Sequence, residues 1–366
     1  MPGVRNVLIV GGGTVGNALA VLLRRASIDV DLVEIDPGWS TLGSGITLQG
    51  NALRVLREVG VWDEVKANIV ARPAHLDEFK TGGPDLPGSC GMYRPKLQEI
   101  LIGAVRRSGT RVRLGITVDE LVQLDGGVDV LFSDRTRGRY DLVVGADGIH
   151  SKVRAMLGIK ARPKSTGLAI WRVYARRPAR LHHGIQHGGV HYIAGYNPVS
   201  PTHLYAYIVE DVRDRAEIRR LDPVAEMRRL AEPLGDPWPD IREDIREPSQ
   251  IDYRYFEYLK VAWPWHRGRV IIVGDAAHAC PPTLAQGAAM GLEDASVLAE
   301  LLIARDTLDE DLFSAFQARR SPRVSRVLEA SVAICDAVKD PRRAPLAMSG
   351  KPLWRDSCQR RRKVSA

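Results

Sequence analysis

The sequence has few cysteines and no long apolar segment, and both features narrow the class of protein. Only four of its 366 residues are cysteines, and no two of them form a CxxC pair: Cys90, Cys280, Cys335 and Cys358. A disulfide framework or a zinc site is therefore not expected, and we predict no metal ligand. No apolar run is long enough to span a bilayer and the N-terminus lacks a secretory signal pattern. We expect a soluble, cytoplasmic protein without a membrane partner.

The chain also lacks the motifs that would explain its basic charge by nucleic-acid binding. The formal net charge is +8, and part of it lies in the run Arg360–Lys363. No base-reading motif or interleaved aromatic pattern accompanies this charge, so no nucleic-acid partner is expected. We interpret residues 341–366 as a basic, flexible tail. Surface charge of this sign also favours anionic substrates or a phosphorylated cofactor.

The first 34 residues carry a dinucleotide-binding pattern. The apolar run 7–10 predicts a buried strand, and the sequence G-G-G-T-V-G follows it directly, before a helical segment and a second strand that ends at Glu34. In this context Gly11 permits a tight turn, Gly13 lets the backbone approach a pyrophosphate, and Gly16 lets the helix pack on the strand. Glu34 is placed to accept hydrogen bonds from an adenosine ribose. The pattern predicts a dinucleotide site but does not choose between NAD(P) and FAD.

Two later segments also place an acid after an apolar strand. The first is Tyr140–Gly145, followed by Asp147, and the second is Val270–Val273, followed by Asp275. Carboxyl ends of parallel strands meet at one edge of a sheet, so the three motifs are expected to converge on one long ligand. A simpler interpretation of Asp147 is that it caps a short helix. After the last motif, a helix starting near Gly287 would direct its free N–H groups at a polar ligand.

Between these motifs the pattern changes to strands, which predicts an α/β fold with an inserted domain. We expect a Rossmann-like nucleotide-binding domain with a parallel sheet, formed by residues 1–166 and 263–340, the second part including a C-terminal helical segment. An antiparallel-sheet substrate domain, residues 167–262, is inserted between the two parts. Within the first part, three segments are interpreted as antiparallel hairpins: 112–114, 118–124 and 128–132.

Taken together, the motifs resemble the single-component (group A) FAD-dependent aromatic monooxygenases, which include para-hydroxybenzoate hydroxylase and salicylate hydroxylase. The resemblance covers residues 5–333. It rests on G-G-G-T-V-G at 11–16 with Glu34, G-A-D-G-I-H-S-K-V-R at 145–154, G-D-A-A-H-A-C-P-P at 274–282, A-Q-G-A-A-M-G at 285–291 and Arg94. Ile35 and Ala289 depart from the common pattern, where many relatives carry a basic residue and an asparagine.

The resemblance implies which residues contact FAD. The glycines of the first motif would hold the pyrophosphate and Glu34 the ribose, while Arg94 and Asp275 would lie along the pyrophosphate and ribityl chain. Asp147 would support the fold around FAD and a transient path for the nicotinamide cofactor. The full predicted set is Gly11, Gly13, Val15, Gly16, Glu34, Gly45, Arg94, Asp147, Asp275, Pro282, Gln286, Gly287 and Ala288. Gln286 and Gly287 are assigned to the isoalloxazine edge.

The reaction implied by the resemblance starts with reduction of FAD by NADH or NADPH. Reduced flavin and O2 then give a C4a-hydroperoxide that hydroxylates a small, electron-rich aromatic substrate. A base that deprotonates a phenolic substrate would help, and His203, Tyr205 and Tyr207 are candidates because they share one face of a predicted strand. The ordinary alternative is that these are half-buried sheet residues. The predicted substrate contacts are Thr47, Gln49, Arg172 and Pro281, and His278 is interpreted as structural, bonded to backbone.

Other functions remain open from the sequence. An epoxidase or another oxidative tailoring enzyme could apply the same flavin chemistry to a non-aromatic substrate. A flavin halogenase is disfavoured because its usual W-x-W-x-I-P motif is absent: Trp263-Pro264-Trp265 is followed by His266-Arg267-Gly268. A non-catalytic relative is disfavoured by the intact glycine and aspartate motifs. The sequence allows a monomer or a homodimer.

Overall fold

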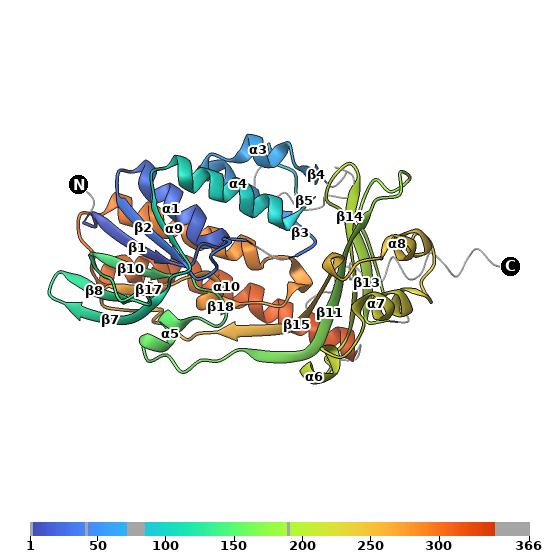
Figure 1. Cartoon of the computed structure of the whole chain (residues 1–366). Helices are drawn as coiled ribbons and strands as arrows, with labels where there is room; N and C mark the ends of the chain where they lie inside the picture. Colours follow the sequence, from blue (N-terminus) through green and yellow to red (C-terminus); the bar gives the residue numbers. More distant parts are fainter. Residues whose placement is uncertain (1–2, 41–42, 72–84, 189–190, 341–366) are drawn as a thin grey trace.

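The computed structural model describes residues 3–40, 43–71, 85–188 and 191–340 (Figure 1). Its first sheet has six strands in the order β16-β17-β10-β1-β2-β6, parallel except for the pairing of β16 with β17. The strands are β1 (Asn6–Val10), β2 (Asp29–Glu34), β6 (Arg111–Leu114), β10 (Leu142–Gly145), β16 (His266–Arg267) and β17 (Val270–Ile272). The tail predicted at 341–366 lies outside the described residues.

The parallel sheet forms because its central strands are apolar on both faces. Val7, Leu8 and Ile9 of β1 have no exposed surface, and such unbroken apolar strands are typical of sheets covered on both sides. One side is covered by three helices, with α1 (Thr14–Arg25) in contact with both α4 (Arg94–Arg107) and α9 (Gly287–Ala304).

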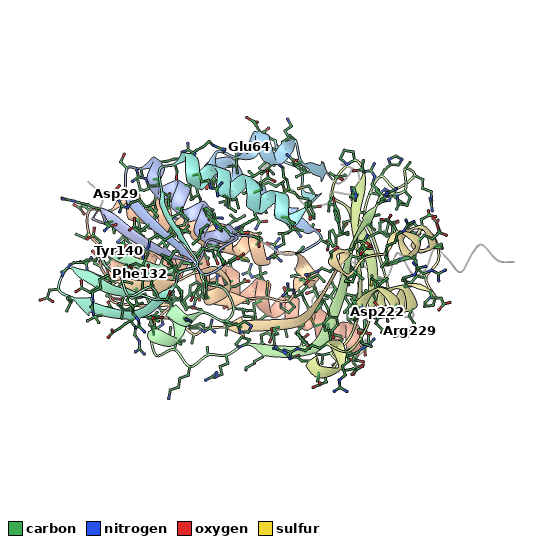
Figure 2. The ribbon with its side chains drawn as sticks, in the orientation of Figure 1. Asp29, Glu64, Phe132, Tyr140, Asp222 and Arg229 are labelled. Atoms are coloured by element: carbon green, nitrogen blue, oxygen red, sulfur yellow. The ribbon has the colours of Figure 1, made fainter. Side chains whose placement is uncertain are left out.

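The other side of the parallel sheet is covered by a three-stranded antiparallel sheet. Its strands are β7 (Val118–Leu124), β8 (Gly127–Phe132) and β9 (Arg137–Tyr140). Phe132 and Tyr140 pack edge to face with ring centroids 6.4 Å apart, and the Tyr140 hydroxyl donates to Asp31 of β2 at 2.7 Å (Figure 2). These contacts join the small sheet to the larger one.

A second six-stranded sheet lies beside this unit, on the right in Figure 1. Its order is β12-β13-β14-β11-β15-β18 and every pair is antiparallel. The strands are β11 (Lys164–Arg176), β12 (Ile185–His187), β13 (Ile193–Pro198), β14 (His203–Asp211), β15 (Ile251–Lys260) and β18 (His278–Ala279).

Alternation along β14 decides which face of this sheet is covered. Leu204, Ala206 and Ile208 are buried in a core shared with α7 (Pro223–Ala231) and α8 (Trp238–Asp244). The odd-numbered residues of the strand therefore point the other way, towards the nucleotide-binding side. The short helix α6 (Arg215–Ile218) and the 3-10 turn η2 (Pro248–Gln250) complete this part of the chain.

Two connections hold the sheets in a fixed relation. Strand β15 pairs with β18, which brings Leu259 beside Ala279 and Lys260 beside His278. The long helix α10 (Glu310–Lys339) contacts α9, β11 and β15. The segment that follows Asp275 therefore contributes a strand, β18, to the second sheet.

Smaller elements fill the junction between the two sheets. Strands β3 (Ile46–Gln49), β5 (Ser89–Met92) and β4 (Ile69–Ala71) form a three-stranded sheet. A Cβ placed on Gly91 of β5 would lie 2.0 Å from the carbonyl oxygen of Pro198, so this sheet meets the end of β13 at close range. The remaining elements are α2 (Gly50–Val59), α3 (Trp62–Lys66), α5 (Lys152–Met156), η3 (Gly274–Ala276) and η4 (Pro282–Leu284).

The predicted fold class is confirmed, with one correction in its first part. Residues 112–114 do not belong to an antiparallel hairpin: β6 pairs parallel with β2 at the edge of the main sheet. The short apolar pattern of 112–114 resembles that of the two strands that follow it in the sequence, which are antiparallel. The direction of β6 is instead set by helix α4, which returns the chain to the end of the sheet where β2 begins. Strand β15 and helix α8 were not predicted. No helix among the described residues is both long and apolar enough to cross a membrane.

Replacement of Gly16 by alanine tests the close packing at the start of α1. A Cβ at this position would lie 1.9 Å from the carbonyl oxygen of Gly11 and 3.1 Å from Ile9. Overpacking of this kind is expected to lower the free energy of unfolding by roughly 2 kcal/mol or more. The control is Gly13→Ala, because a Cβ on Gly13 meets no atom of the described chain within 4 Å. Urea unfolding of the apoproteins should separate the two variants; equal stability would contradict the prediction.

Candidate active site

Strands β2, β1, β10 and β17 end at the same edge of the parallel sheet. Val10 is paired with Val33 on β2 and with Gly145 on β10, and Gly145 is paired with Ile272 on β17. The segments that follow these strands therefore lie side by side, as the sequence predicted: the glycine motif, Glu34, Asp147-Gly148 and Gly274-Asp275.

The glycine motif leaves its middle residue open and packs its outer residues tightly. Gly11 has a φ of +107°, and a Cβ there would lie 2.4 Å from the carbonyl oxygen of Ala146. Gly13 is exposed and precedes α1, and no side chain of the described residues caps this helix start. Its free N–H groups are available to an anion. Val15 does not point to this opening: a Cβ on Gly291 would lie 2.4 Å from Val15 Cγ2, so Val15 packs α1 on α9.

The backbone N–H and the carbonyl oxygen of Gly12 are both hydrogen-bonded, and two of the partners, Trp39 and Gln98, were not predicted from the sequence. Its N–H donates to Glu34 at 2.7 Å, and its carbonyl oxygen accepts from Trp39 Nε1 and Gln98 Nε2, both at 2.8 Å. The second oxygen of Glu34 accepts from the N–H of Asp36 at 2.8 Å. Each carboxylate oxygen keeps a further lone pair, so Glu34 can still accept bonds from ribose hydroxyls. The glycine loop is therefore held by hydrogen bonds from within the protein.

Asp147 acts first as a helix cap, which was the simpler interpretation of the sequence. Its Oδ2 accepts from the N–H groups of Lys152 and Val153 at 2.7 and 3.1 Å. The other oxygen, Oδ1, is buried without a hydrogen-bond partner among the described residues, and burial raises the pKa of the carboxyl. Arg154 joins this motif to the last one, because its guanidinium donates to the carbonyl oxygens of Ala276 and Ile149 at 3.0 and 2.8 Å.

Asp275 carries an accessible carboxylate that is nevertheless surrounded by protein. Its side chain is exposed, yet burial raises its pKa, against the charges of His278 and Arg94. Both observations hold together if the carboxylate lies in a recess, open on one side only. It accepts no hydrogen bond from any residue that the structure describes. Arg94, at the first position of α4, is exposed and, like His278, contributes a charge that lowers the pKa of Asp275.

The loop after Asp275 ends at the start of α9. Pro281 is buried and Pro282 is exposed at the start of η4. Gln49 donates to the carbonyl oxygen of Leu284 at 2.9 Å, so it holds the loop. Helix α9 begins at Gly287, with Ala288 half-buried behind it; the first turn has no acidic residue and no capping side chain within the described chain. This helix start, like that of α1, offers unpaired N–H groups to a ligand.

A buried cluster of charged side chains lies beneath this loop. Asp294 of α9 accepts from the N–H of Gly274 at 2.8 Å, from His278 Nε2 at 2.6 Å and from Arg320 Nε at 2.7 Å. His278 is thus structural. We had expected it to bond backbone, but its partner is the Asp294 side chain. The expectation failed because the partner is 16 residues away on another helix. The charges of His278 and Arg320 outweigh the effect of burial and lower the pKa of Asp294 to about 2.

Tyr205 connects the second sheet to the nucleotide-binding side. It is 9% exposed, and its hydroxyl is 3.0 Å from Thr47 Oγ1 and 3.1 Å from Asn197 Nδ2, which donates to it. A Cβ on Gly45 would lie 2.1 Å from the Tyr205 ring, so Gly45 is required for this contact. The structure therefore brings two predicted substrate or catalytic residues, Thr47 and Tyr205, together, and adds Asn197.

Tyr207 and Arg172 lie on the same face of the sheet, on paired positions of β14 and β11. The Tyr207 hydroxyl donates to Gln186 at 3.1 Å, and burial raises the pKa of Tyr207 well above its usual range. Arg172 is an ion-pair partner of Asp252 at 3.6 Å, too long for a hydrogen bond. Burial lowers the pKa of Arg172, which shows that this guanidinium is poorly solvated.

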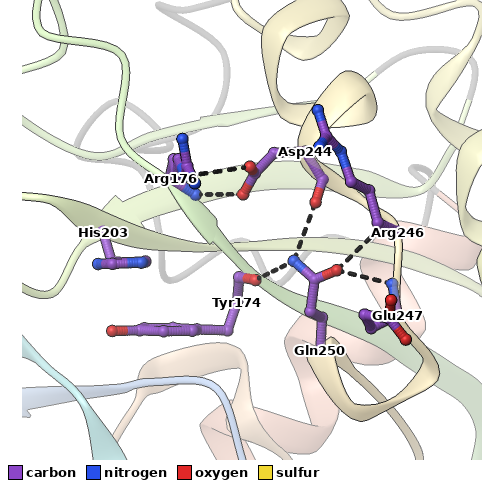
Figure 3. A pocket seen from close by; sticks show the side chains of 7 residues that line it. All are labelled: Tyr174, Arg176, His203, Asp244, Arg246, Glu247 and Gln250. Atoms are coloured by element: carbon purple, nitrogen blue, oxygen red, sulfur yellow. Dashed lines mark hydrogen bonds and ion pairs between the residues drawn. The ribbon is translucent and has the colours of Figure 1, made fainter.

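His203 is the first residue of β14 and lines a surface pocket (Figure 3). Its ring stacks on Tyr174 with centroids 4.6 Å apart, and Nδ1 is 2.9 Å from Thr202 Oγ1. The pocket is lined by Tyr174, Arg176, His203, Asp244, Arg246, Glu247 and Gln250. None of the described contacts of His203 involves Tyr205, Thr47 or Asp275. The sequence placed His203 and Tyr205 on one face correctly, but it could not show how far along that face the site extends.

These features fit FAD. The strand order places an acid at the end of β2 first, then the open glycine in front of α1, then the accessible carboxylate of Asp275 after β17, with a second open helix start at α9. This order matches the ribose, pyrophosphate, ribityl chain and ring of FAD. Among the described residues no group of three His, Cys, Asp or Glu side chains is arranged to hold a metal ion.

Replacement of Asp294 by asparagine tests the buried cluster. The pKa of Asp294 is lower in the folded state than in the unfolded chain, where it is about 3.9. The unfolded state therefore binds more protons between about pH 4 and 2, and the stabilisation by Asp294 is complete above this window and lost within it. At pH 7 the variant should be less stable by about 3 kcal/mol, because Arg320 loses a buried partner.

The variant should also lose less stability than wild type on acidification from pH 4. Urea unfolding as a function of pH measures both effects. Asp119→Asn, on the exposed side of β7, is the control and should leave the profile unchanged. An Asp294→Asn profile parallel to that of wild type below pH 4 would refute the assignment.

Comparison with known proteins agrees with this geometry. The sequence model of the family described as FAD binding domain matches residues 5–331. The chain is 32% identical over 350 residues to 2-heptyl-3-hydroxy-4(1H)-quinolone synthase of Pseudomonas aeruginosa, covering 89% of this chain and 87% of the relative. It is 27% identical over 365 residues to 6-hydroxynicotinate 3-monooxygenase of Bordetella bronchiseptica, covering 90% and 91%.

Solved structures lead to the same group. A mutant of 2-methyl-3-hydroxypyridine-5-carboxylic acid oxygenase superposes with a TM-score of 0.77 at 25% identity, covering 92% of both chains. HpxO of Klebsiella pneumoniae, complexed with FAD and uric acid, shares the fold with a TM-score of 0.77 at 23% identity, covering 92% of this chain and 90% of HpxO. The protein is an FAD-dependent monooxygenase and belongs to the single-component aromatic hydroxylases, a family whose FAD-binding domain spans nearly the whole chain.

Proposed function

We propose that the protein hydroxylates a small aromatic substrate with electrons from NADH or NADPH and one oxygen atom from O2. The balanced reaction converts substrate, O2, NAD(P)H and a proton into hydroxylated substrate, water and NAD(P)+. Bound FAD supplies the redox chemistry that passes two electrons to oxygen. The observation that carries the proposal is the polar face of the second sheet, with Tyr205 and Arg172 turned towards the side that holds Asp275 and the start of α9.

We assign the cofactor to the edge of the parallel sheet. Residues 1–166 and 263–340 form the FAD domain, and residues 167–262 supply the wall against which the substrate lies. Gly13 and the start of α1 bind the pyrophosphate, Glu34 the ribose, and Asp275 with Arg94 the ribityl and phosphate portion. The ring lies by Gln286, Gly287 and Ala288, where the helix dipole favours the negative charge that the ring gains on reduction.

Tyr205 is the best candidate to manage a substrate proton. Its hydroxyl accepts a hydrogen bond from Asn197 and forms a second one with Thr47, so its position is fixed. Tyr207 stays neutral at neutral pH because burial raises its pKa, and its hydroxyl proton is donated to Gln186. His203 is a weaker candidate, since its contacts lie in the pocket of Figure 3.

Arg172 favours a substrate with an anionic group. Its long ion pair with Asp252 leaves donors free, and a poorly solvated guanidinium gains from a carboxylate or phenolate partner. The names of the relatives suggest the ring type: a quinolone, a hydroxynicotinate and, for an enzyme of Streptomyces cremeus, an aminohydroxybenzoate. We therefore propose a hydroxylated or amino-substituted ring, with nitrogen heteroaromatics as the first group to examine.

The decisive experiment is NADH and NADPH oxidation across a panel of such rings with and without a carboxylate, with product analysis. A substrate should stimulate oxidation and gain one oxygen atom, and Arg172→Met should raise KM for the carboxylated substrate about tenfold or more while affecting the uncharged analogue little. Tyr205→Phe should lower kcat. Failure of every aromatic compound to stimulate oxidation would refute the proposal and favour the epoxidase or other non-aromatic tailoring reaction.

Gly13→Ala tests the cofactor assignment separately from turnover. The added methyl meets no protein atom within 4 Å among the described residues, so folding should be intact. It would occupy the approach to the N–H groups of α1, and FAD affinity should fall about tenfold or more. Flavin fluorescence titration of the apoprotein measures this. Wild-type affinity in Gly13→Ala would contradict the assignment.

A further inference from the structure

Three charged side chains are buried beneath the proposed flavin site without any part in substrate chemistry. Asp294 has no exposed surface, Arg320 is 3% exposed and Glu293 is 4% exposed. Removing charges from water is costly, and well-packed apolar residues often replace buried ion pairs without loss of stability. A contribution to stability is therefore a weak explanation for the presence of this cluster. Its hydrogen-bond geometry indicates that it positions neighbouring segments.

Arg320 of α10 uses one guanidinium to hold three acceptors on α9. Its Nε and Nη1 bind Asp294 Oδ1 and Glu293 Oε2, both at 2.7 Å, and its Nη2 binds the carbonyl oxygen of Met290 at 2.9 Å. Arg323 also binds Glu293, at 2.7 Å. Two carboxylates face two guanidinium groups, so the cluster is nearly neutral and acts through position more than through net charge.

The two carboxylates are linked by hydrogen bonds to the two ends of the loop that follows β17. Asp294 holds the first end, through the N–H of Gly274 and the ring of His278. Glu293 holds the second end, because its Oε1 accepts from Asn51 Nδ2 at 2.8 Å, and the same amide group donates to Gln286 Oε1 at 3.1 Å. Arg320 thus orients both carboxylates, the one that holds the Asp275 segment and the one that is linked through Asn51 to Gln286.

We propose that Arg320 is a positioning residue for the flavin. By orienting the carboxylates of Asp294 and Glu293, it sets the positions of the Asp275 segment and the α9 start relative to FAD. It thereby sets the affinity of the protein for FAD and the reduction potential of the bound FAD. The inference rests on the proposed placement of the ring at the start of α9. Stabilisation by a helix start falls off within one turn, so a small shift of this end weakens it. The reduced ring, which carries more negative charge, should lose more than the oxidised ring.

Arg320→Lys tests the proposal, because lysine keeps the charge but cannot present a planar fork to three acceptors. The matched control is Arg319→Lys. Arg319 is the neighbouring residue and also joins α10 to α9, through Glu300 at 2.8 and 2.7 Å, but it is 42% exposed and its partner lies away from the loop. Both variants are measured as purified full-length protein for FAD dissociation, two-electron midpoint potential and urea unfolding of the apoprotein.

Arg320→Lys should weaken FAD binding about tenfold and lower the midpoint potential by about 30 mV, which corresponds to a tenfold larger loss for reduced than for oxidised FAD in a two-electron couple. Arg319→Lys should leave the FAD affinity within about twofold of wild type and the midpoint potential within about 10 mV. If Arg320→Lys is less stable but its folded fraction keeps the wild-type potential and affinity, the cluster is only structural and the proposal is wrong.

Asn51→Ala provides the second test if Arg320→Lys does not fold. It cuts the link to Gln286 and leaves the bonds of Arg320 intact, so the potential should fall while apoprotein stability changes less than in Arg320→Lys. A wild-type potential in Asn51→Ala would overturn the proposal. These measurements use neither NAD(P)H nor an aromatic substrate, so a failed search for hydroxylation leaves them interpretable, and a failed potential shift leaves the proposed reaction standing.

Discussion

The parallel register of β1 with its two neighbours is the constraint on which the site depends. It places Val10, Val33 and Gly145 at one level, so the turns that follow them must share a narrow edge. Gly11 approaches the carbonyl of Ala146 so closely that no side chain fits between them. Three motifs that lie far apart in the sequence, from Gly11 to Asp275, become one binding surface because their strands are neighbours in the sheet.

The site combines rigid and open polar groups. The carboxylates of Asp294 and Glu293 each accept three hydrogen bonds below the surface, whereas the carboxylate of Asp275 is accessible and accepts none within the described chain. The bonded carboxylates hold the protein structure, and the open carboxylate is left for the ligand. This division explains how a site can be ordered before binding and still offer donors and acceptors.

Much of the fold was predictable because it depends on local pattern. Apolar strands followed by glycine or an acid predicted β1, β10 and β17, and alternation predicted which residues of β14 share each face. The sequence also contains a clue that we did not use: Glu293-Asp294 interrupts an apolar helix, and buried acids require partners. The identity of that partner, Arg320, could not be inferred, because it lies 26 residues beyond Asp294 on another helix.

The order of residues along the chain is sufficient to establish the nucleotide-binding turns and the family, since each motif is a short run whose chemistry is complete in itself. The contacts between the second sheet and the nucleotide-binding part could be seen only in the tertiary structure. Tyr205 meets Thr47 across 158 residues, Asn51 meets Gln286 across 235, and His203 stacks on Tyr174, the β11 residue paired with Tyr205. Such contacts arise from how sheets and helices pack, and packing depends on shape complementarity between surfaces that no local pattern records.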